Sequence, residues 1–121
     1  MPFIEVTDSG ANAEIRSRST QTMTKALCDA FKIAPEIVTC YYKSCDNYSY
    51  GHAGKFGDNA EKFRIFVKVF AFPRAAEQKN QAALEITKAV TDAYSAAAKD
   101  VIIYFLDQQP ADAFHAGLPS D

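Results

Sequence analysis

The strongest constraint on the fold is that the chain repeats itself with one constant spacing. The sequence TKALCDAF at residues 24–31 returns as TKAVTDAY at residues 87–94, an offset of 63 residues. The same offset relates the triplet HAG at residues 52–54 to an identical triplet at residues 115–117. Two copies of one supersecondary unit explain this pattern, because a solenoid of stacked repeats needs more copies than two.

Each copy has the residue pattern of a strand, a helix and a second strand. Apolar residues at helical spacing predict one buried helix face per copy. These faces comprise Thr20, Met23, Leu27, Ala30 and Ala34 in the first copy and Ala83, Ile86, Val90, Ala93 and Ala97 in the second. Ser9 or Asn12 is expected to cap the first helix, and Pro35 is expected to end it. Runs rich in Val, Ile, Phe and Tyr predict strands at residues 3–7, 37–43, 63–72 and 101–106.

The order of these elements predicts an α+β fold in a single domain that spans residues 1–121. A helix long enough to cross over a sheet makes the two strands that flank it parallel. Two such β-α-β repeats, at about 2–61 and 63–121, form a four-stranded mixed sheet with both helices on one face. Residues 46–62 are rich in Gly and Asn, so we expect a hairpin or loop between the repeats.

The third predicted strand is apolar on both of its faces. One face carries Phe63, Ile65, Val67 and Val69, and the other carries Phe66, Phe70 and Phe72. Helices on one side of the sheet would leave the other side as an apolar patch too large for a monomer in water. We therefore expect the chain to associate with itself through the open face of the sheet.

Charge and cysteine content exclude several classes of function. The net charge is −2 and Lys and Arg are scattered, so neither nucleic acid nor a membrane surface is an expected partner. No apolar run approaches the ~20 residues of a membrane span, and Glu5, Asp8 and Glu14 interrupt any signal-peptide core. The three cysteines lack a Cys-x-x-Cys pair, which predicts neither a disulfide framework nor a zinc site. We expect a cytoplasmic protein with no metal and no other cofactor.

The second residue is the candidate for acid–base chemistry. If Met1 is removed, the nitrogen of Pro2 is a free secondary amine that can gain or lose a proton. A general base works best when its pKa lies near the working pH, and a free α-amine has a pKa of about 8. An apolar wall from Phe3 and Ile4, and a cation such as Arg74, would both favour the neutral amine. Taken alone, a proline after the first methionine is more often only a processed terminus.

Several features together resemble the tautomerase superfamily. They are the Met-Pro start, the duplicated β-α-β unit, the segment FPRAAEQK at residues 72–79 and the Gly-rich segment GHAGKFG at residues 51–57. The resemblance covers nearly the whole chain, and its specificity comes from the combination of features. It implies a homotrimer in which six β-α-β units surround a central barrel, with an active site at the amino-terminal proline. The aromatic loop at residues 48–56 departs from the family's pattern.

The resemblance also implies roles for particular residues. Pro2 matches the family's amino-terminal base, Arg74 a carboxylate-binding arginine, and Tyr104 a tyrosine that positions water or substrate. His115 stands where the dehalogenases of the family carry the acidic residue that activates water, and Ala71 stands where they carry an additional arginine. These departures favour simple keto–enol tautomerisation over hydration or dehalogenation. His115 stays a polar candidate for substrate binding.

The predicted function is proton transfer between the keto and enol forms of a small α-keto acid, with the Pro2 amine as general base. The partners implied are a small-molecule carboxylate substrate and two further copies of the chain. One alternative is a trimeric binding or signalling protein of the same fold without catalysis. Another is a ferredoxin-like binding module, which has the same order of elements but a different pairing of strands. The two histidines of the HAG triplets lack a third metal ligand and are expected to be turn residues.

Overall fold

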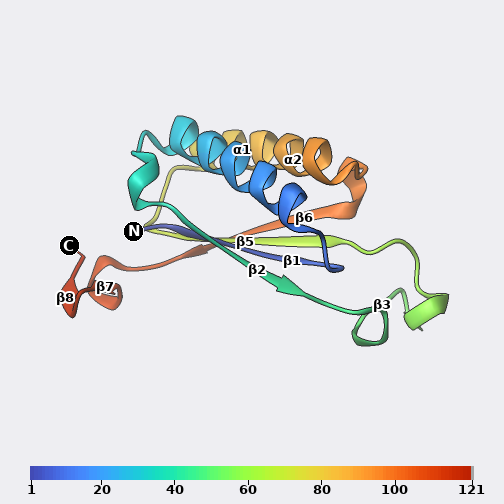
Figure 1. Ribbon diagram of the computed structural model, residues 1–121. Helices are drawn as coiled ribbons and strands as arrows, with labels where there is room; N and C mark the ends of the chain where they lie inside the picture. Colours follow the sequence, from blue (N-terminus) through green and yellow to red (C-terminus); the bar gives the residue numbers. More distant parts are fainter. Residues whose placement is uncertain (121) are drawn as a thin grey trace.

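Two helices lie side by side over one face of a four-stranded sheet, and the other face of the sheet is uncovered (Figure 1). The structure is a computed structural model that describes residues 1–120. The sheet contains β1 (Phe3–Asp8), β2 (Thr39–Ser44), β5 (Ile65–Ala71) and β6 (Val101–Asp107). The helices are α1 (Ala13–Phe31) and α2 (Ala76–Tyr94). The predicted α+β fold with both helices on one face of a mixed sheet is confirmed.

The strands pair in the order β2-β1-β5-β6. β1 is parallel to β2 and β5 is parallel to β6, because α1 and α2 each cross over between neighbouring strands. The two central strands, β1 and β5, run antiparallel and place Phe3 opposite Phe70 and Val6 opposite Val67. In a ferredoxin-like module another strand separates the two strands that flank each helix. The observed pairing therefore overturns the ferredoxin-like alternative.

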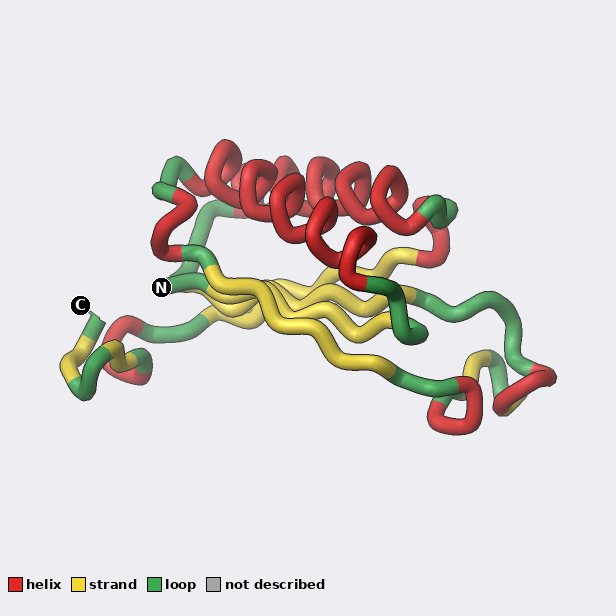
Figure 2. Tube along the Cα trace, viewed as in Figure 1, coloured by secondary structure: helices red, strands yellow, loops and turns green. Residues whose placement is uncertain are grey.

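The elements of the second half follow those of the first at the spacing of the sequence repeat. α1 begins at Ala13 and α2 at Ala76, and each helix contains 19 residues. Each half ends in a small antiparallel hairpin, and the two hairpins extend beyond opposite ends of the sheet (Figure 2). The hairpins are formed by β3 (Gly51–His52) with β4 (Lys55–Phe56) and by β7 (Phe114–His115) with β8 (Leu118–Pro119). The first hairpin confirms the prediction for residues 46–62. Asp121, the last residue of the second predicted repeat, lies outside the described residues.

Local sequence signals place the start of α1 and the body of each long strand correctly. The Oδ1 atom of Asn12 accepts a hydrogen bond from the N–H of Ile15 at 2.9 Å, as expected of a helix cap. The third strand is shorter than predicted at both ends. The ring of Phe63 packs on the ring of Tyr50, with centroids 4.4 Å apart, so this residue belongs to the connection and not to β5. Phe72 lies beyond β5, where the chain turns towards α2.

Both helices end earlier than the sequence pattern predicts. Lys32 and Ser95 adopt left-handed backbone angles, with φ of 57° and 53°, and they close α1 and α2. Pro35 therefore does not end α1, but begins the short 3-10 turn that leads towards β2. Ala34 and Ala97, which helical spacing assigned to the buried faces, lie beyond the helices and are exposed.

The inner face of the sheet packs against both helices and forms the core. Along β1 the fully buried side chains alternate at Ile4 and Val6, and along β5 at Val67 and Val69. The fully buried helix residues that cover them are Met23 and Leu27 of α1 and Ile86 and Val90 of α2. Burial of each such side chain stabilises the fold by roughly 1.5–3 kcal/mol. Because each helix is apolar on one face only, no helix within residues 1–120 is long and apolar enough to cross a membrane.

The uncovered face of the sheet combines aromatic and charged side chains. Phe66, Lys68 and Phe70 of β5 point to this face and are half-buried. Glu5 of β1 forms ion pairs with Lys43 at 3.5 Å and with Lys68 at 3.6 Å. The prediction that β5 is apolar on both faces is thus correct for Phe66 and Phe70, whereas Lys68 places a charge between them.

A buried carboxylate ties β1 to both helices at the end of the sheet remote from Pro2. Asp8 has an exposed fraction of 1%, and Arg16 of α1 donates hydrogen bonds to its two oxygens at 2.7 and 3.1 Å. The hydroxyl of Tyr94, at the end of α2, donates to the same carboxylate at 2.7 Å. Burial alone would raise the pKa of Asp8, but hydrogen bonds from Arg16, Tyr94 and two backbone N–H groups hold it below its ordinary value.

Replacing Asp8 with Ala is expected to lower the free energy of unfolding by about 3 kcal/mol, because Arg16 is left half-buried without its partner. Since the folded-state pKa of Asp8 is depressed, its contribution is fully present above 3.8 and is lost as the pH falls through the lower, folded-state pKa. Urea unfolding at neutral pH and at about pH 2 measures both effects.

The control for this prediction is Asp29→Ala, which breaks only the exposed pair between Lys25 and Asp29. This change should leave the unfolding midpoint almost unchanged, because exposed pairs are screened by solvent. Equal and small effects of the two substitutions at neutral pH would contradict a stabilising role for the Asp8 cluster.

Candidate functional site

Pro2 is buried at the start of β1, beside a cavity of about 300 Å³. Its carbonyl oxygen accepts a hydrogen bond from the N–H of Thr39 at 3.4 Å, which holds the residue against β2. The walls of the cavity are mainly aromatic and are formed by Phe3, Tyr41, Phe70, Phe72 and Phe114. A cavity of this size and lining fits a small planar molecule.

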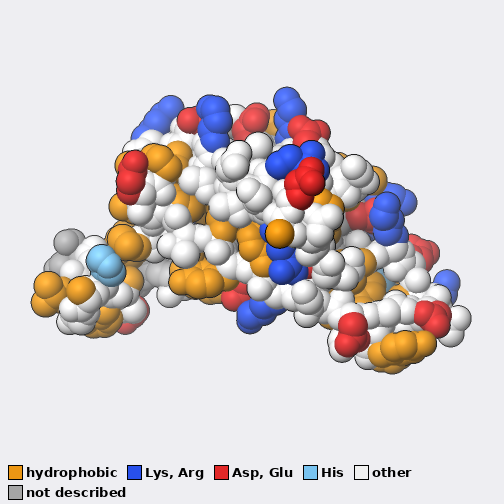
Figure 3. All heavy atoms as spheres, in the orientation of Figure 1, with side chains coloured by type: hydrophobic (Ala, Val, Ile, Leu, Met, Phe, Trp, Pro, Cys, Tyr) orange, Lys and Arg blue, Asp and Glu red, His pale blue; other side chains and the backbone are white. Residues whose placement is uncertain are grey.

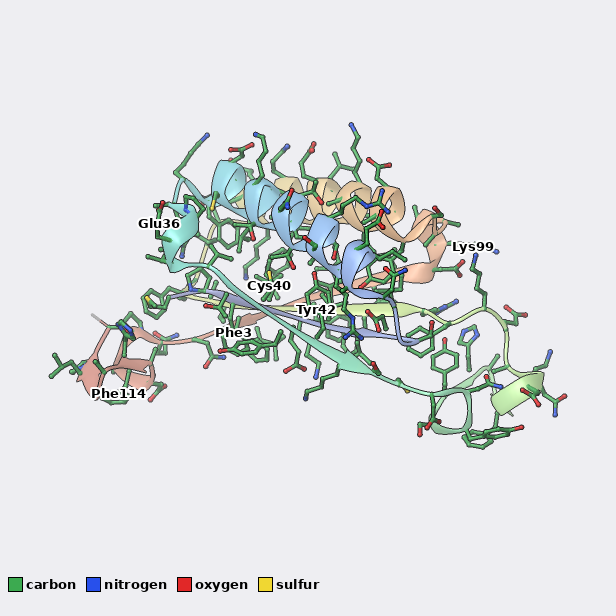
Figure 4. All side chains as sticks on the ribbon, viewed as in Figure 1. Phe3, Glu36, Cys40, Tyr42, Lys99 and Phe114 are labelled. Atoms are coloured by element: carbon green, nitrogen blue, oxygen red, sulfur yellow. The ribbon has the colours of Figure 1, made fainter. Side chains whose placement is uncertain are left out.

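Three distant parts of the chain meet at this cavity because β1 and β5 run antiparallel. The carboxyl end of β5 lies beside the amino end of β1, and the ring of Phe70 stacks on that of Phe3 with centroids 4.3 Å apart. Tyr41 of β2 meets Phe3 edge to face, with 5.6 Å between the ring centroids. The C-terminal hairpin adds Phe114, which lies at the same end of the molecule as the amino-terminus (Figures 1 and 4).

The two faces of β2 direct neighbouring side chains to different surroundings. Cys40 and Tyr42 point towards the helices, whereas Phe3 of the adjacent strand points to the opposite face (Figure 4). The hydroxyl of Tyr42 is within hydrogen-bond distance of the hydroxyls of Ser19 and Thr20, at 2.6 and 2.9 Å. Tyr42 is therefore a structural residue of the helix–sheet interface, and Tyr41 is the tyrosine that β2 supplies to the cavity.

Asp112 carries the only charged side chain among the described residues that line the cavity. It ends the 3-10 turn Pro110–Asp112, which precedes the C-terminal hairpin, and it is exposed. Gln108 lines the cavity as well, and its N–H donates to the carbonyl oxygen of Ala71 at 2.8 Å. Sequence reasoning did not identify Asp112 or Gln108, because no spacing signal connects this segment with Pro2.

Arg74 lies near the cavity but does not line it. Its Nη1 atom donates hydrogen bonds to the carbonyl oxygens of Phe72 at 2.8 Å and of Pro73 at 3.3 Å. The guanidinium also sits over the ring of Phe31, 4.8 Å from its centroid. Among residues 1–120, no side chain or carbonyl accepts a hydrogen bond from its Nε or Nη2 atom. The side chain thus contacts both the end of α1 and the loop after β5. Its Nε and Nη2 atoms remain available as hydrogen-bond donors.

Two other residues named from the sequence are Tyr104 and His115, which have different surroundings within the chain. Tyr104 of β6 is opposite Lys68 and meets the ring of Phe66 edge to face, with centroids 5.3 Å apart. His115 is exposed in β7. Neither belongs to the lining of the Pro2 cavity, whereas Ala71 does. The sequence analysis assigned a role to Tyr104, whereas the tyrosine that lines the cavity is Tyr41. The repeat was the signal that could have identified Tyr41, because it lies 63 residues before Tyr104.

The cysteines and histidines do not line the Pro2 cavity in the part of the chain that the structure describes. Cys28, Cys40 and Cys45 are free, and burial raises the pKa of the Cys28 and Cys40 thiols, which disfavours the nucleophilic thiolate. Within residues 1–120, no group of three or more His, Cys, Asp or Glu side chains is arranged to hold a metal ion. His52 and His115 lie in the two separate hairpins.

Comparison with known proteins finds similar structures but no match by sequence. No protein-family model and no curated protein matches the sequence. Native fused 4-OT superposes with a TM-score of 0.90 at 16% identity, covering 98% of this chain and 95% of that chain. Pt0534 inactivated by 2-oxo-3-pentynoate gives a TM-score of 0.85 at 19% identity, covering 98% and 94%. The Q0 fused 4-OT symmetric trimer gives 0.85 at 18% identity, covering 98% and 94%.

These structures are of tautomerase superfamily members, as the features of the sequence implied. At identities below 20% the similarity is one of fold, because residues of the site need not be shared at this distance. The chain has the fold of the tautomerase superfamily.

Proposed function

We propose that the chain is an isomerase of the tautomerase superfamily that interconverts the keto and enol forms of a small α-keto acid. The amine of Pro2, freed by removal of Met1, is the general base of this reaction. One observation carries the proposal: Pro2 is buried beside an aromatic cavity of about 300 Å³. The inactivation of Pt0534 by 2-oxo-3-pentynoate supports the substrate class, because that compound is itself a 2-oxo acid.

The proposed reaction is a proton transfer within one substrate molecule. The neutral nitrogen of Pro2 takes a proton from the carbon next to the carbonyl, and the carbonyl becomes an enolate. The ammonium form of Pro2 then gives the proton to the enolate oxygen, which regenerates the base. A C–H bond is broken and an O–H bond is formed within the same molecule, so the reaction needs no oxidant, reductant or second substrate.

The surroundings of Pro2 act on its pKa in two directions. The aromatic side chains around the cavity disfavour a charged amine and lower the pKa of the base. The carboxylate of Asp112 at the same cavity favours the ammonium form and opposes this effect. Because Asp112 is exposed, solvent weakens its influence, and the apolar walls are the stronger contribution in this account.

The remaining site residues are proposed to bind the carboxylate and the other polar groups of the substrate. Arg74 has donor atoms without a partner in the described residues, and it lies in the loop that follows Phe72. Phe72 itself lines the cavity. Tyr104 and His115 do not line the cavity of their own chain, so their proposed roles require that an adjacent copy supplies them. We propose cytoplasmic localisation on the basis of the three free cysteines.

A homotrimer is proposed because the open face of the sheet needs a covering. Phe66, Phe70 and Tyr104 lie on this face, and fused 4-OT of the same fold forms a symmetric trimer. Large hydrophobic side chains are also exposed on both hairpins, at opposite ends of the molecule (Figure 3). We further propose that each protomer is a single domain of two tandem β-α-β repeats, since elements of the two halves share one sheet and one core.

Blocking the nitrogen of Pro2 is expected to abolish activity without unfolding the protein. Protein that retains Met1 should ketonise phenylenolpyruvate at least about 100-fold more slowly than processed protein, which is the usual contribution of a general base. Initial rates on samples of verified intact mass measure the effect, and circular dichroism checks the fold. If the two samples turn over the substrate at equal rates, Pro2 is not the base. If neither sample turns it over, the trimeric binding protein becomes the better account.

Substitution of Arg74 by Ala is expected to raise KM for carboxylate substrates by roughly tenfold or more. The reason is the loss of charged hydrogen bonds to the substrate, worth about 1.5–3 kcal/mol. Arg64→Ala is the control, because Arg64 lies beyond the opposite end of β5. Steady-state kinetics compare the two variants, and equal small changes in KM would identify Arg74 as a structural residue only.

Sedimentation equilibrium at micromolar concentration is expected to give about three times the protomer mass of 13.3 kDa. The physical reason is the half-buried aromatic side chains on the uncovered face, which a closed assembly would remove from water. A single species at the mass of a monomer or a dimer would refute the homotrimer.

A further inference from the structure

We infer that Tyr41 is a catalytic residue of the Pro2 site, where its hydroxyl donates a hydrogen bond to the enolate oxygen. This inference rests on the proposed function and goes beyond it, because the resemblance to the tautomerases points to Tyr104. The internal repeat makes Tyr41 and Tyr104 equivalent residues, separated by the constant offset of 63. The structure separates the two, because only Tyr41 lines the cavity beside Pro2.

The ring of Tyr41 is positioned by aromatic contacts. It meets Phe3 edge to face at an interplanar angle of 86°, and Phe3 in turn stacks on Phe70 at 14°. These three rings form one wall of the cavity. Edge-to-face pairs of this kind stabilise a defined ring position. Phe replaces Tyr without loss of this contact, so the hydroxyl can be tested separately from the ring.

The hydroxyl of Tyr41 is free to bind a ligand. Within residues 1–120 it has no hydrogen-bond partner, and the side chain is 55% exposed. In contrast, the hydroxyls of Tyr42 and Tyr94 are held by partners in the helix–sheet interface. An unpaired phenol hydroxyl beside a cavity is a donor that can stabilise negative charge as it develops on a substrate oxygen.

The other polar groups of the cavity are less suited to this role. The carboxylate of Asp112 would repel an oxyanion. The Nε2 atom of Gln108 donates one of its two hydrogens to the carbonyl oxygen of Asp107, at 3.3 Å, and an amide is a weaker acid than a phenol and so a weaker donor to an oxyanion. Thr39 and Ser120 also carry neutral side-chain hydroxyls in the lining of the cavity. Thr39 belongs to the same strand as Tyr41 and serves as an alternative in the test below.

Tyr104 occupies the equivalent surroundings without a base. It meets Phe66 edge to face as Tyr41 meets Phe3, and Phe66 follows Ile65 as Phe3 follows Pro2. Ile65 is within the chain, so its nitrogen is part of a peptide bond and cannot act as an amine base. Within one protomer, therefore, only the first repeat places a tyrosine beside a terminal amine.

In the inferred step, Pro2 takes the proton from the carbon next to the carbonyl, and the electron pair of that C–H bond forms the C=C bond. The π electrons of the carbonyl move to its oxygen, which carries the negative charge. Tyr41 donates a hydrogen bond to this oxygen and keeps its own proton. The ammonium of Pro2 then protonates the oxygen to give the enol, so atoms and charges balance without a further reactant.

The test compares Tyr41→Phe with Tyr104→Phe in processed protein, using the ketonisation of phenylenolpyruvate, which passes through the same enolate in the reverse direction. We expect Tyr41→Phe to lower kcat roughly 10- to 100-fold with little change in KM, because the hydrogen bond forms only as charge develops. Tyr104→Phe should instead raise KM with a smaller effect on kcat, because its proposed role is to bind the substrate from an adjacent copy. Circular dichroism and sedimentation of both variants exclude a structural cause.

Several outcomes would overturn the inference. A loss of kcat in Tyr104→Phe but not in Tyr41→Phe would assign the role to Tyr104 of an adjacent copy. A loss in Thr39→Val with none in Tyr41→Phe would assign it to Thr39. A change in KM alone for Tyr41→Phe would show uniform binding and not catalysis. If processed wild-type protein is itself inactive, the proposed function fails first, and that result is distinct from an active Tyr41→Phe variant.

Discussion

The antiparallel pairing of β1 with β5 is the constraint on which the rest of the structure depends. It joins two parallel β-α-β units into one sheet and brings the amino end of β1 beside the carboxyl end of β5. The stack of Phe3 on Phe70 is a direct product of this register. A shift by one residue would turn Phe3 to the helix side and move Ile4 out of the core. The core and the Pro2 cavity are therefore specified by the same register.

The two ends of the helix–sheet interface have diverged, although the repeat makes them equivalent. At one end Asp8 is buried with Arg16 and Tyr94, and this cluster fixes β1 to both helices. At the Pro2 end, the residues 63 positions away from Asp8 and Tyr94 are Ala71 and Phe31. One end of the interface thus has a buried ionic anchor, whereas at the other end Lys79, the equivalent of Arg16, forms a partly exposed ion pair with Asp107 at 2.9 Å. The apolar side chains that line the cavity beside Pro2 favour the neutral form of a terminal amine.

Much of the fold could be predicted from the sequence because its signals are local. Helical spacing located both helices, and Asn12 located the start of α1 through one hydrogen bond. The ends of the helices were less predictable, since the left-handed residues Lys32 and Ser95 close them and neither is Gly or Asn, the usual signals.

The residues of the site could be predicted only in part, because several of them meet through contacts between distant segments of the chain. Pro2 was identifiable because its chemistry depends on its place in the chain. Asp112 and Phe114 reach the cavity through the return of the C-terminal segment to β1, which no local pattern encodes. The choice between Tyr41 and Tyr104 needs three-dimensional contacts, because the repeat places them in matching sequence surroundings.

The most direct test of this account is the protonation of the Pro2 nitrogen, measured by ¹⁵N NMR on processed protein labelled with [¹⁵N]proline. The chain contains five prolines, and the other four are tertiary amides that do not titrate, so one resonance should move with pH. The account predicts that its pKa equals the pKa on the acid limb of the kcat/KM profile, which reports the essential base of the free enzyme. A Pro2 resonance that stays constant across that limb, or titrates well away from it, would contradict Pro2 as the base.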